Sequence, residues 1–227
     1  MTEPAGTTDS ASDTLRAVVR ADWDAAVTHR FVRELYAGTL PTAALRRYLV
    51  QDYQFVDGFT ALLGATVACA DSAAARMVIA RQLGMVAQEE NTYFQRAFDA
   101  LGVSGPERTA PGLLPPTAEF SGLMSEAAAS LDYASCLTVL TVAEWLYLDW
   151  AQRAPRPLPS DPLAREWIEI HDNAAFRDWV GFLRGELDRT VPRLPVAARD
   201  RSGQLFARVT RLELRFFEAA YHGNAYS

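Results

Sequence analysis

The sequence is most informative in one apolar run, CLTVLTVAEWLYLDWA, residues 136–151. Taken as a helix, this run places apolar side chains on one stripe, because residues three and four positions apart share a face. Glu144 lies within that stripe, between Leu140 and Tyr147. An ionised carboxylate among apolar side chains is costly unless it is paired, hydrogen-bonded or protonated. The run therefore predicts a functional acid at Glu144, or a shift of register that leaves this side chain at an exposed edge.

Helical periodicity extends over nearly the whole chain, and no segment alternates polar and apolar residues as a strand does. The expected helices cover residues 13–36 with a break near 29, 42–70, 71–101, 117–130, 133–151, 162–172, 174–190 and 195–221. Proline and glycine gather at residues 102–116, and proline gathers again at 155–159. These breaks separate helices without separating domains. The sequence predicts an all-α single domain over residues 14–227, preceded by a disordered tail at residues 1–13.

The composition excludes several classes of function. The chain has 227 residues and a formal net charge of −6, and all 22 of its basic residues are arginine. The acidic balance argues against nucleic acid or an anionic membrane as a principal partner. The absence of lysine excludes a lysine Schiff base and a phosphate-loop lysine.

The sequence also bears on location. No segment approaches the roughly 20 consecutive apolar residues that a membrane-spanning helix needs. The first residues, MTEPAGTTDSASD, have neither the basic region nor the apolar core of a signal peptide. Cys69 and Cys136 lie in helical patterns without CxxC spacing, which is typical of reduced thiols. We therefore expect a cytoplasmic protein.

Two further acids interrupt apolar stripes. Asp52 does so within residues 44–69, and Glu213 does so in the last helix, one turn after Val209. One such acid is usually a satisfied structural residue. Three helices that each replace one core position with an acid favour a different interpretation, in which Asp52, Glu144 and Glu213 converge on one polar cavity.

Metal chemistry is the obvious alternative for a helical bundle with buried carboxylates. Di-iron sites of this kind use about four acids and two histidines, usually with a Glu-x-x-His pair. The chain has no Glu-x-x-His, and its three histidines, His29, His171 and His222, are far apart in sequence. We therefore expect no metal site and no other cofactor.

Other candidates have both a structural and a functional interpretation. His171 follows Trp167 by one turn at the end of a short helix, where a histidine is either a hydrogen-bonded structural residue or a ligand-binding group. If the acids converge, aromatic faces beside them would stack on a flat heteroaromatic ligand; otherwise they belong to the core. The aromatic residues concerned are Phe55, Phe120, Tyr147 and Phe216.

Several stretches of the chain resemble, in the same order, the TenA family, the thiaminase II-like proteins of thiamin salvage. The stretches are HRFV (29–32), GTLPTAALRRYLVQDYQFVDGF (38–59), WLYLDW (145–150), WIEIHDN (167–173) and LELRFFEAAY (212–221). The Gln-Asp pair with its following aromatic residues is the most specific of them. The resemblance covers about residues 14–225 and implies the heme-oxygenase-like all-α fold, without heme, and a pocket for the aminopyrimidine half of thiamin.

The resemblance implies roles for four positions. Asp52 matches the acid that binds the pyrimidine, and Glu213 matches an acid of the last helix that donates or accepts a proton. Tyr147 matches an active-site tyrosine. Phe216 matches a ring that stacks on the pyrimidine.

The chain departs from the thiaminase branch of the family at several of these sites. Ala143 stands where that branch has a nucleophilic cysteine, and Glu144 next to it matches the branch that has a glutamate and no active-site cysteine. Cys136 is seven residues earlier, about 10 Å along a helix at 1.5 Å per residue, so it should not substitute. Three positions where the thiaminase branch has tyrosines are also changed: Phe55, Phe120 and His171.

These departures favour salvage of damaged thiamin over cleavage of thiamin itself. The expected reaction is hydrolysis of formylaminopyrimidine or aminopyrimidine to hydroxymethylpyrimidine with water as nucleophile, for which Glu144 and Glu213 supply base and acid in either order. Tyr147 is expected to assist catalysis. The expected substrate-binding residues are Asp52, Phe55, Phe120, His171 and Phe216.

Three alternatives remain open at this level. The same pocket suits a pyrimidine-binding or regulatory protein without turnover, a thiaminase II that acts on thiamin, and a metal-dependent oxidase on the same scaffold. The only partner expected besides the pyrimidine is a second copy of the chain, in a homodimer or homotetramer.

Overall fold

Helix α10 (Tyr133–Gln152) lies at the centre of the computed structural model, which describes residues 10–86 and 91–223. The other helices are α1 (Ala11–Val18), α2 (Arg20–Val27), α3 (Arg30–Ala37), α4 (Thr42–Asp52), α5 (Phe55–Cys69), α6 (Ala73–Met85), α7 (Asn91–Ala100), α8 (Gly105–Thr109), α9 (Pro115–Ser130), α11 (Pro162–His171), α12 (Ala174–Thr190), the 3-10 helix η2 (Val191–Arg193) and α13 (Val196–His222). Helices α2, α5, α9, α11, α12 and α13 all pack against α10.

The central position of α10 explains its composition. Every side chain from residue 136 to residue 142 is buried, so the helix has no solvent face over this part. A helix enclosed on all sides needs apolar residues all round rather than on one stripe. The single core-facing stripe expected from the sequence was therefore too narrow, because Val139 and Leu146, which lie off it, are buried as well.

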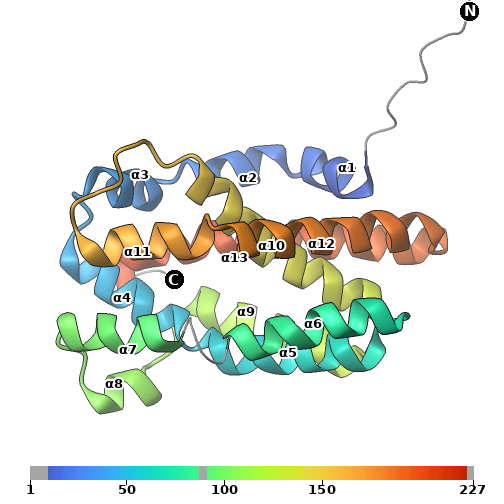
Figure 1. Cartoon of the computed structure of the whole chain (residues 1–227), viewed down its shortest axis with the longest axis horizontal. Helices are drawn as coiled ribbons and strands as arrows, with labels where there is room; N and C mark the ends of the chain where they lie inside the picture. The colour runs from blue at the N-terminus through green and yellow to red at the C-terminus, as the bar shows by residue number, and fades with distance from the viewer. Residues whose placement is uncertain (1–9, 87–90, 224–227) are drawn as a thin grey trace, which may run out of the picture.

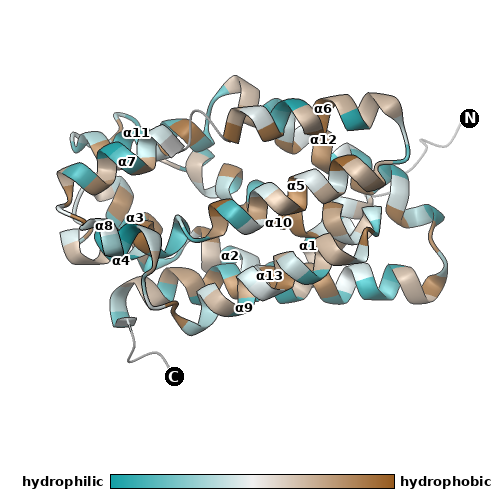
Figure 2. Cartoon of the chain, turned by 90° about the horizontal axis from the view of Figure 1, so that it is seen from below, coloured by the Kyte–Doolittle hydropathy of each residue, from teal (hydrophilic) through white to brown (hydrophobic). Residues whose placement is uncertain are grey.

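The helices around α10 form one all-helical domain, as the sequence predicts. Helices α1, α2 and α3 follow one another along one long edge of the molecule, and α5, α6 and α7 lie along the opposite edge (Figure 1). Hydrophilic and hydrophobic residues alternate along the outer helices (Figure 2), as expected where one face meets the core and the other meets solvent. Within residues 10–86 and 91–223, no helix is both long and apolar enough to cross a membrane.

The first helix begins earlier than expected. Ser10 caps α1 by accepting a hydrogen bond from the backbone N–H of Asp13 at 3.2 Å. The backbone N–H of Ser12 donates to Asp188 on α12 at 2.7 Å, which fastens this end of α1 to the domain. The tail expected over residues 1–13 is thus too long by the first turn of α1, and residues 1–9 lie outside the described ranges. The expected capping of α10 by Asp132 and of α11 by Asp161 is confirmed.

The single helix expected over residues 42–70 is wrong. Helix α4 ends at Asp52 and α5 begins at Phe55, with a tight turn in which the Gln54 N–H bonds the Gln51 carbonyl. The Gln54 side chain holds this turn by donating to the carbonyls of Val50 and of Arg108, at 3.0 and 3.1 Å. The turn allows the end of α4 and the start of α5 to meet the same cavity.

One other expected helix falls partly outside the described ranges, and one expected break contains a helix. The helix expected over residues 71–101 corresponds to α6 and α7, and residues 87–90 between them lie outside the described ranges. The expected break at 102–116 contains the short helix α8, which Ser104 and Glu107 begin with reciprocal side-chain to backbone contacts. Such a box signals a helix start even between proline and glycine residues.

The central packing of α10 should dominate stability. We expect Leu140→Ala, at a fully buried position of α10, to lower the free energy of unfolding by about 2–5 kcal/mol, because the lost burial and the cavity left behind add together. Leu131→Ala is the matched control, since Leu131 at the end of α9 is 57% exposed. Urea unfolding of both variants measures the difference. Equal losses would contradict the central role of α10.

Candidate active site

A cavity of about 160 Å³ lies where eight helices meet. An engineered cavity of about 150 Å³ is known to hold benzene, so this volume suits one six-membered ring. The lining residues are Asp52, Phe55, Val56, Phe59, Gln82, Met85, Val86, Phe120, Met124, Ala143, Glu144, Tyr147, Trp167, Ile170, His171, Asn173, Ala175, Phe176 and Glu213.

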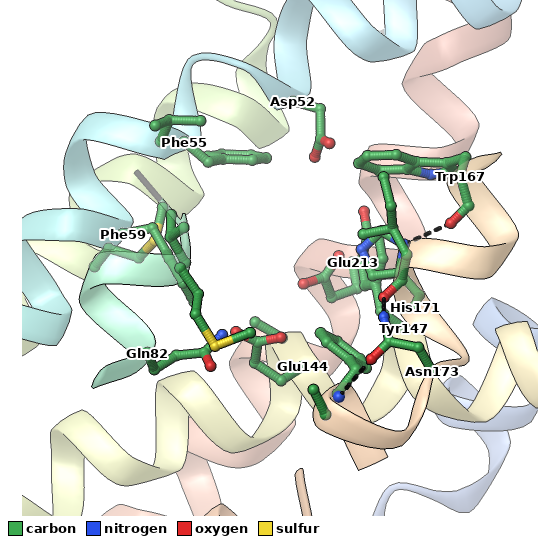
Figure 3. A pocket seen from close by; sticks show the side chains of 18 of the residues that line it. Asp52, Phe55, Phe59, Gln82, Glu144, Tyr147, Trp167, His171, Asn173 and Glu213 are labelled. Carbon is green, nitrogen blue, oxygen red and sulfur yellow. Dashed lines mark hydrogen bonds between the residues drawn. The ribbon is translucent and has the colours of Figure 1, made fainter. Parts of the chain in front are cut away.

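The three acids singled out by the sequence all line this cavity. Asp52 is the last residue of α4, Glu144 lies in α10 and Glu213 lies in α13. Their side chains are 9%, 8% and 2% exposed. Asp52 and Glu144 lie at opposite ends of the cavity, with Glu213 between them (Figure 3). The structure thus brings together acids from helices that are far apart in sequence.

The environment of Glu213 favours its neutral form. Burial raises the pKa of Glu213 well above its usual range, and the negative charges of Asp52 and Glu144 raise it further. Both causes act against ionisation, because a buried charge loses its hydration and a like charge nearby repels it. These surroundings favour Glu213 as a neutral carboxylic acid, which is able to donate a hydrogen bond or a proton.

Tyr147 forms a hydroxyl pair that the sequence did not indicate. Its hydroxyl lies 2.7 Å from the hydroxyl of Tyr48 on α4, and both groups are buried. Burial raises the pKa of both phenols well above their usual value, so both stay protonated. In such a pair one hydroxyl donates to the other, which leaves one proton for a further acceptor.

His171 lines the cavity in a neutral state. Its Nδ1 lies 2.8 Å from the carbonyl oxygen of Trp167, and because a carbonyl only accepts, Nδ1 carries the hydrogen. Burial lowers the pKa of His171 to about 4, which the hydrogen bond to Trp167 only partly offsets. At neutral pH the ring therefore offers Nε2 as a hydrogen-bond acceptor and contributes no positive charge.

The aromatic residues divide into lining and supporting rings. Phe55 and Phe120 both line the cavity, with ring centroids 5.2 Å apart. Phe216 is not among the lining residues, and its ring packs directly on Phe55 at 5.1 Å and on Tyr48 at 5.2 Å. Phe216 therefore lies behind Phe55 in this arrangement, and its expected stacking on a ligand stays a prediction.

The two thiols take no part in the cavity. Cys136 is fully buried, and its Sγ donates to the carbonyl of Ala127 at 3.3 Å. Burial raises the pKa of Cys136 to about 12, so it is a neutral thiol at physiological pH. Ala143 does line the cavity and presents only a methyl group there. Among the described residues, no three His, Cys, Asp or Glu side chains are grouped so as to hold a metal ion.

Most of the remaining wall was not predicted, and one polar residue in it had a usable signal. Gln82 shares a stripe of α6 with the buried residues Ala75, Ile79 and Val86 at helical spacing. This is the same pattern of a polar residue on a core-facing stripe that identified the acids. Asn173 also lines the cavity, but its side chain caps α12 by accepting from the Phe176 N–H at 2.9 Å.

Comparison with protein families and sequences gives a consistent picture. The model of the TENA/THI-4/PQQC family matches residues 16–223. The aminopyrimidine aminohydrolase of Bacillus subtilis is 22% identical over 216 residues, which are 95% of this chain and 92% of that protein. The hydroxymethylpyrimidine/phosphomethylpyrimidine kinase THI20 of Saccharomyces cerevisiae is 22% identical over 220 residues, which are 89% of this chain and 37% of that longer protein.

Solved structures share the fold. A TenA homologue from P. horikoshii OT3 superimposes with a TM-score of 0.84 at 22% identity, covering 95% of this chain and all of that one. A TenA family transcription regulator from Silicibacter sp. TM1040 superimposes with a TM-score of 0.83 at 24% identity, covering 97% of this chain and 99% of that one.

The raised pKa of Glu213 should appear in the pH dependence of stability. Above about pH 4.5 the unfolded chain releases this proton while the folded chain keeps it, so Glu213 stabilises the fold fully below that pH and progressively less as the pH rises. We expect the free energy of unfolding of wild type relative to Glu213→Gln to fall from pH 4.5 to pH 7, by up to about 1.4 kcal/mol per unit.

Urea unfolding at several pH values measures this difference. The opposite effect of His171 cancels because both proteins contain it. Glu126→Gln on α9 is the control, since that side chain is 70% exposed. A difference between wild type and Glu213→Gln that does not change with pH would contradict a neutral Glu213.

Proposed function

The chain belongs to the TENA/THI-4/PQQC family, and we propose that it hydrolyses C–N bonds of aminopyrimidine fragments from degraded thiamin. The substrates in this proposal are formylaminopyrimidine and aminopyrimidine, and the product is hydroxymethylpyrimidine. The observation that carries the proposal is the meeting of Asp52, Glu144 and Glu213 around a cavity of one-ring size. The name of the Bacillus subtilis relative, an aminopyrimidine aminohydrolase, supports the same class of reaction.

The ring is bound, in this proposal, at the Asp52 end of the cavity. A carboxylate pairs with an exocyclic amine and an adjacent ring nitrogen through two parallel hydrogen bonds. Phe55 and Phe120 supply the aromatic wall against which the ring stacks, and the neutral His171 accepts a hydrogen bond through Nε2. Phe216 acts indirectly by supporting the ring of Phe55.

Water is the nucleophile because the cavity offers no thiolate. Ala143 occupies the position at which the thiaminase branch has its cysteine, and Glu144 follows it, so we assign the chain to the glutamate branch of the family. Glu144 acts as the base that orients a water molecule and takes its proton. Thiamin itself is accordingly not a substrate.

Glu213 is the acid of the pair. A carboxyl group held neutral by burial and by two neighbouring negative charges has a proton to give to the leaving nitrogen. The Tyr48–Tyr147 pair lies close enough to Asp52 for the negative charge of Asp52 to raise the phenol pKa values, in addition to burial. Its remaining hydroxyl proton is available to hold that carboxylate in place.

Removing either acid should stop turnover. We expect Glu144→Gln and Glu213→Gln each to lower kcat by about 100-fold or more on the formylated and free aminopyrimidines, the usual scale of an acid or base contribution. Time-resolved mass spectrometry of substrate and product measures this, and Glu126→Gln is the exposed control. Wild-type turnover in either variant would end the assignment, and a wild-type protein that returns both pyrimidines unchanged would be a binding protein.

The cysteines should be dispensable. We expect Cys136→Ala to keep kcat within about threefold of wild type, because the thiol is neutral, buried and outside the cavity wall. Assays of the folded variant on the same pyrimidines, with thiamin as a further substrate, measure this. A loss of 100-fold, or rapid cleavage of thiamin by wild type, would contradict water as the nucleophile.

A further inference from the structure

Hydrolysis of an N-acyl amine makes a demand that the three acids do not meet. When water attacks the acyl carbon, the carbonyl oxygen becomes negatively charged and needs hydrogen-bond donors. No lysine or arginine is among the described residues that line the cavity. Asp52 and Glu144 are acceptors when ionised, and Glu213 holds the proton that the leaving nitrogen requires.

The other polar residues of the described wall either use their donors already or do not present them to the cavity. Asn173 donates Nδ2–H to the carbonyl of Ile170 at 2.8 Å, and His171 donates Nδ1–H to the carbonyl of Trp167. The indole nitrogen of Trp167 is fully buried, so it does not reach the cavity surface. The one spare proton of the Tyr48–Tyr147 pair lies near the carboxylate of Asp52, which is a stronger acceptor than a carbonyl.

Gln82 is different. It is half-buried on α6, and Figure 3 shows its side chain entering the cavity beside Glu144, at the end away from Asp52. Within residues 10–86 and 91–223 its carboxamide has no hydrogen-bond partner. Its neighbours on the wall from α5 and α6 are apolar, among them Phe59 and Met85. A carboxamide in that setting has both N–H bonds available for a ligand.

We propose that Gln82 is a further catalytic residue, whose Nε2–H donates to the carbonyl oxygen of an N-acylated aminomethylpyrimidine and stabilises the oxyanion formed from it. This inference rests on the function proposed above. With the ring at Asp52, the substituent extends toward Glu144, where Gln82 also lies. The arrangement selects substrates with an acyl group on the exocyclic methylene nitrogen.

The step balances without a further reactant. The water oxygen bonds to the acyl carbon, a water proton passes to Glu144, and the carbonyl π electrons move to the oxygen that faces Gln82. The carbonyl then re-forms, the C–N bond breaks, and the nitrogen takes its electrons and the proton of Glu213. A formyl substrate yields formic acid and the primary amine, and the proton on Glu144 returns to solvent or to Glu213.

The inference separates two substrates that differ only in the acyl group. We expect Gln82→Met, which keeps the length and removes the donor, to lower kcat on the N-formyl aminopyrimidine by about 100-fold with KM within about threefold. Turnover of the free aminopyrimidine, which has no carbonyl, should stay within about threefold of wild type.

Gln204→Met is the matched control, since Gln204 is exposed on α13. Thermal unfolding of each variant reports whether it is folded. The role of Gln82 would be overturned if Gln82→Met kept its kcat on the formyl substrate or lost activity equally on both substrates. It would also be overturned if the wild-type protein hydrolysed the free amine and not the formyl substrate. Each of these results would leave the hydrolase proposal standing. If the wild-type protein hydrolyses only the formyl substrate, the kcat of Gln82→Met on that substrate is by itself the test of the role of Gln82. A wild-type protein that hydrolyses neither substrate would refute the proposed function and this inference together.

Discussion

The repulsion among three buried carboxyl groups is the constraint on which the rest of the site depends. Asp52, Glu144 and Glu213 come from three helices and share one cavity, so each loses hydration and each feels the charge of the others. Such a cluster destabilises the fold unless one member stays protonated. The apolar packing around α10 offsets the free-energy cost of burying the acids that stay charged. This helix buries residues on all sides, and Glu144 extends from it into the cavity.

The same repulsion divides the chemical work. From sequence alone Glu144 and Glu213 are interchangeable as base and acid. In the structure Glu213 lies between the other two acids and is the most buried of the three, so its pKa rises and it keeps its proton. Two carboxyl groups of equal intrinsic acidity acquire different functions from their surroundings, as is common where a site needs an acid and a base together.

Sequence periodicity predicted the all-helical domain and the three acids, because a polar residue on an apolar stripe is visible without coordinates. Periodicity does not reveal a tight turn such as Tyr53–Gln54, since both residues keep helical backbone angles. It also does not say which of two adjacent rings faces a cavity, and so Phe55 lines it while Phe216 lies behind. Gln82 lies on an apolar stripe as the acids do, but a neutral amide costs less to bury, so its position there is weaker evidence for a site.

Replacing a thiol nucleophile by water changes where the site needs hydrogen-bond donors for the oxygen that becomes charged. Residues 143 and 144 are adjacent on α10 and therefore about 100° apart around the helix axis, at 3.6 residues per turn. A water molecule oriented by Glu144 approaches the substrate from another direction than a sulfur atom at position 143 would. The oxygen that becomes charged must then point toward a wall that carries a donor. Gln82, which enters the cavity from α6 beside Glu144, meets that requirement with a neutral amide that does not disturb the balance among the acids.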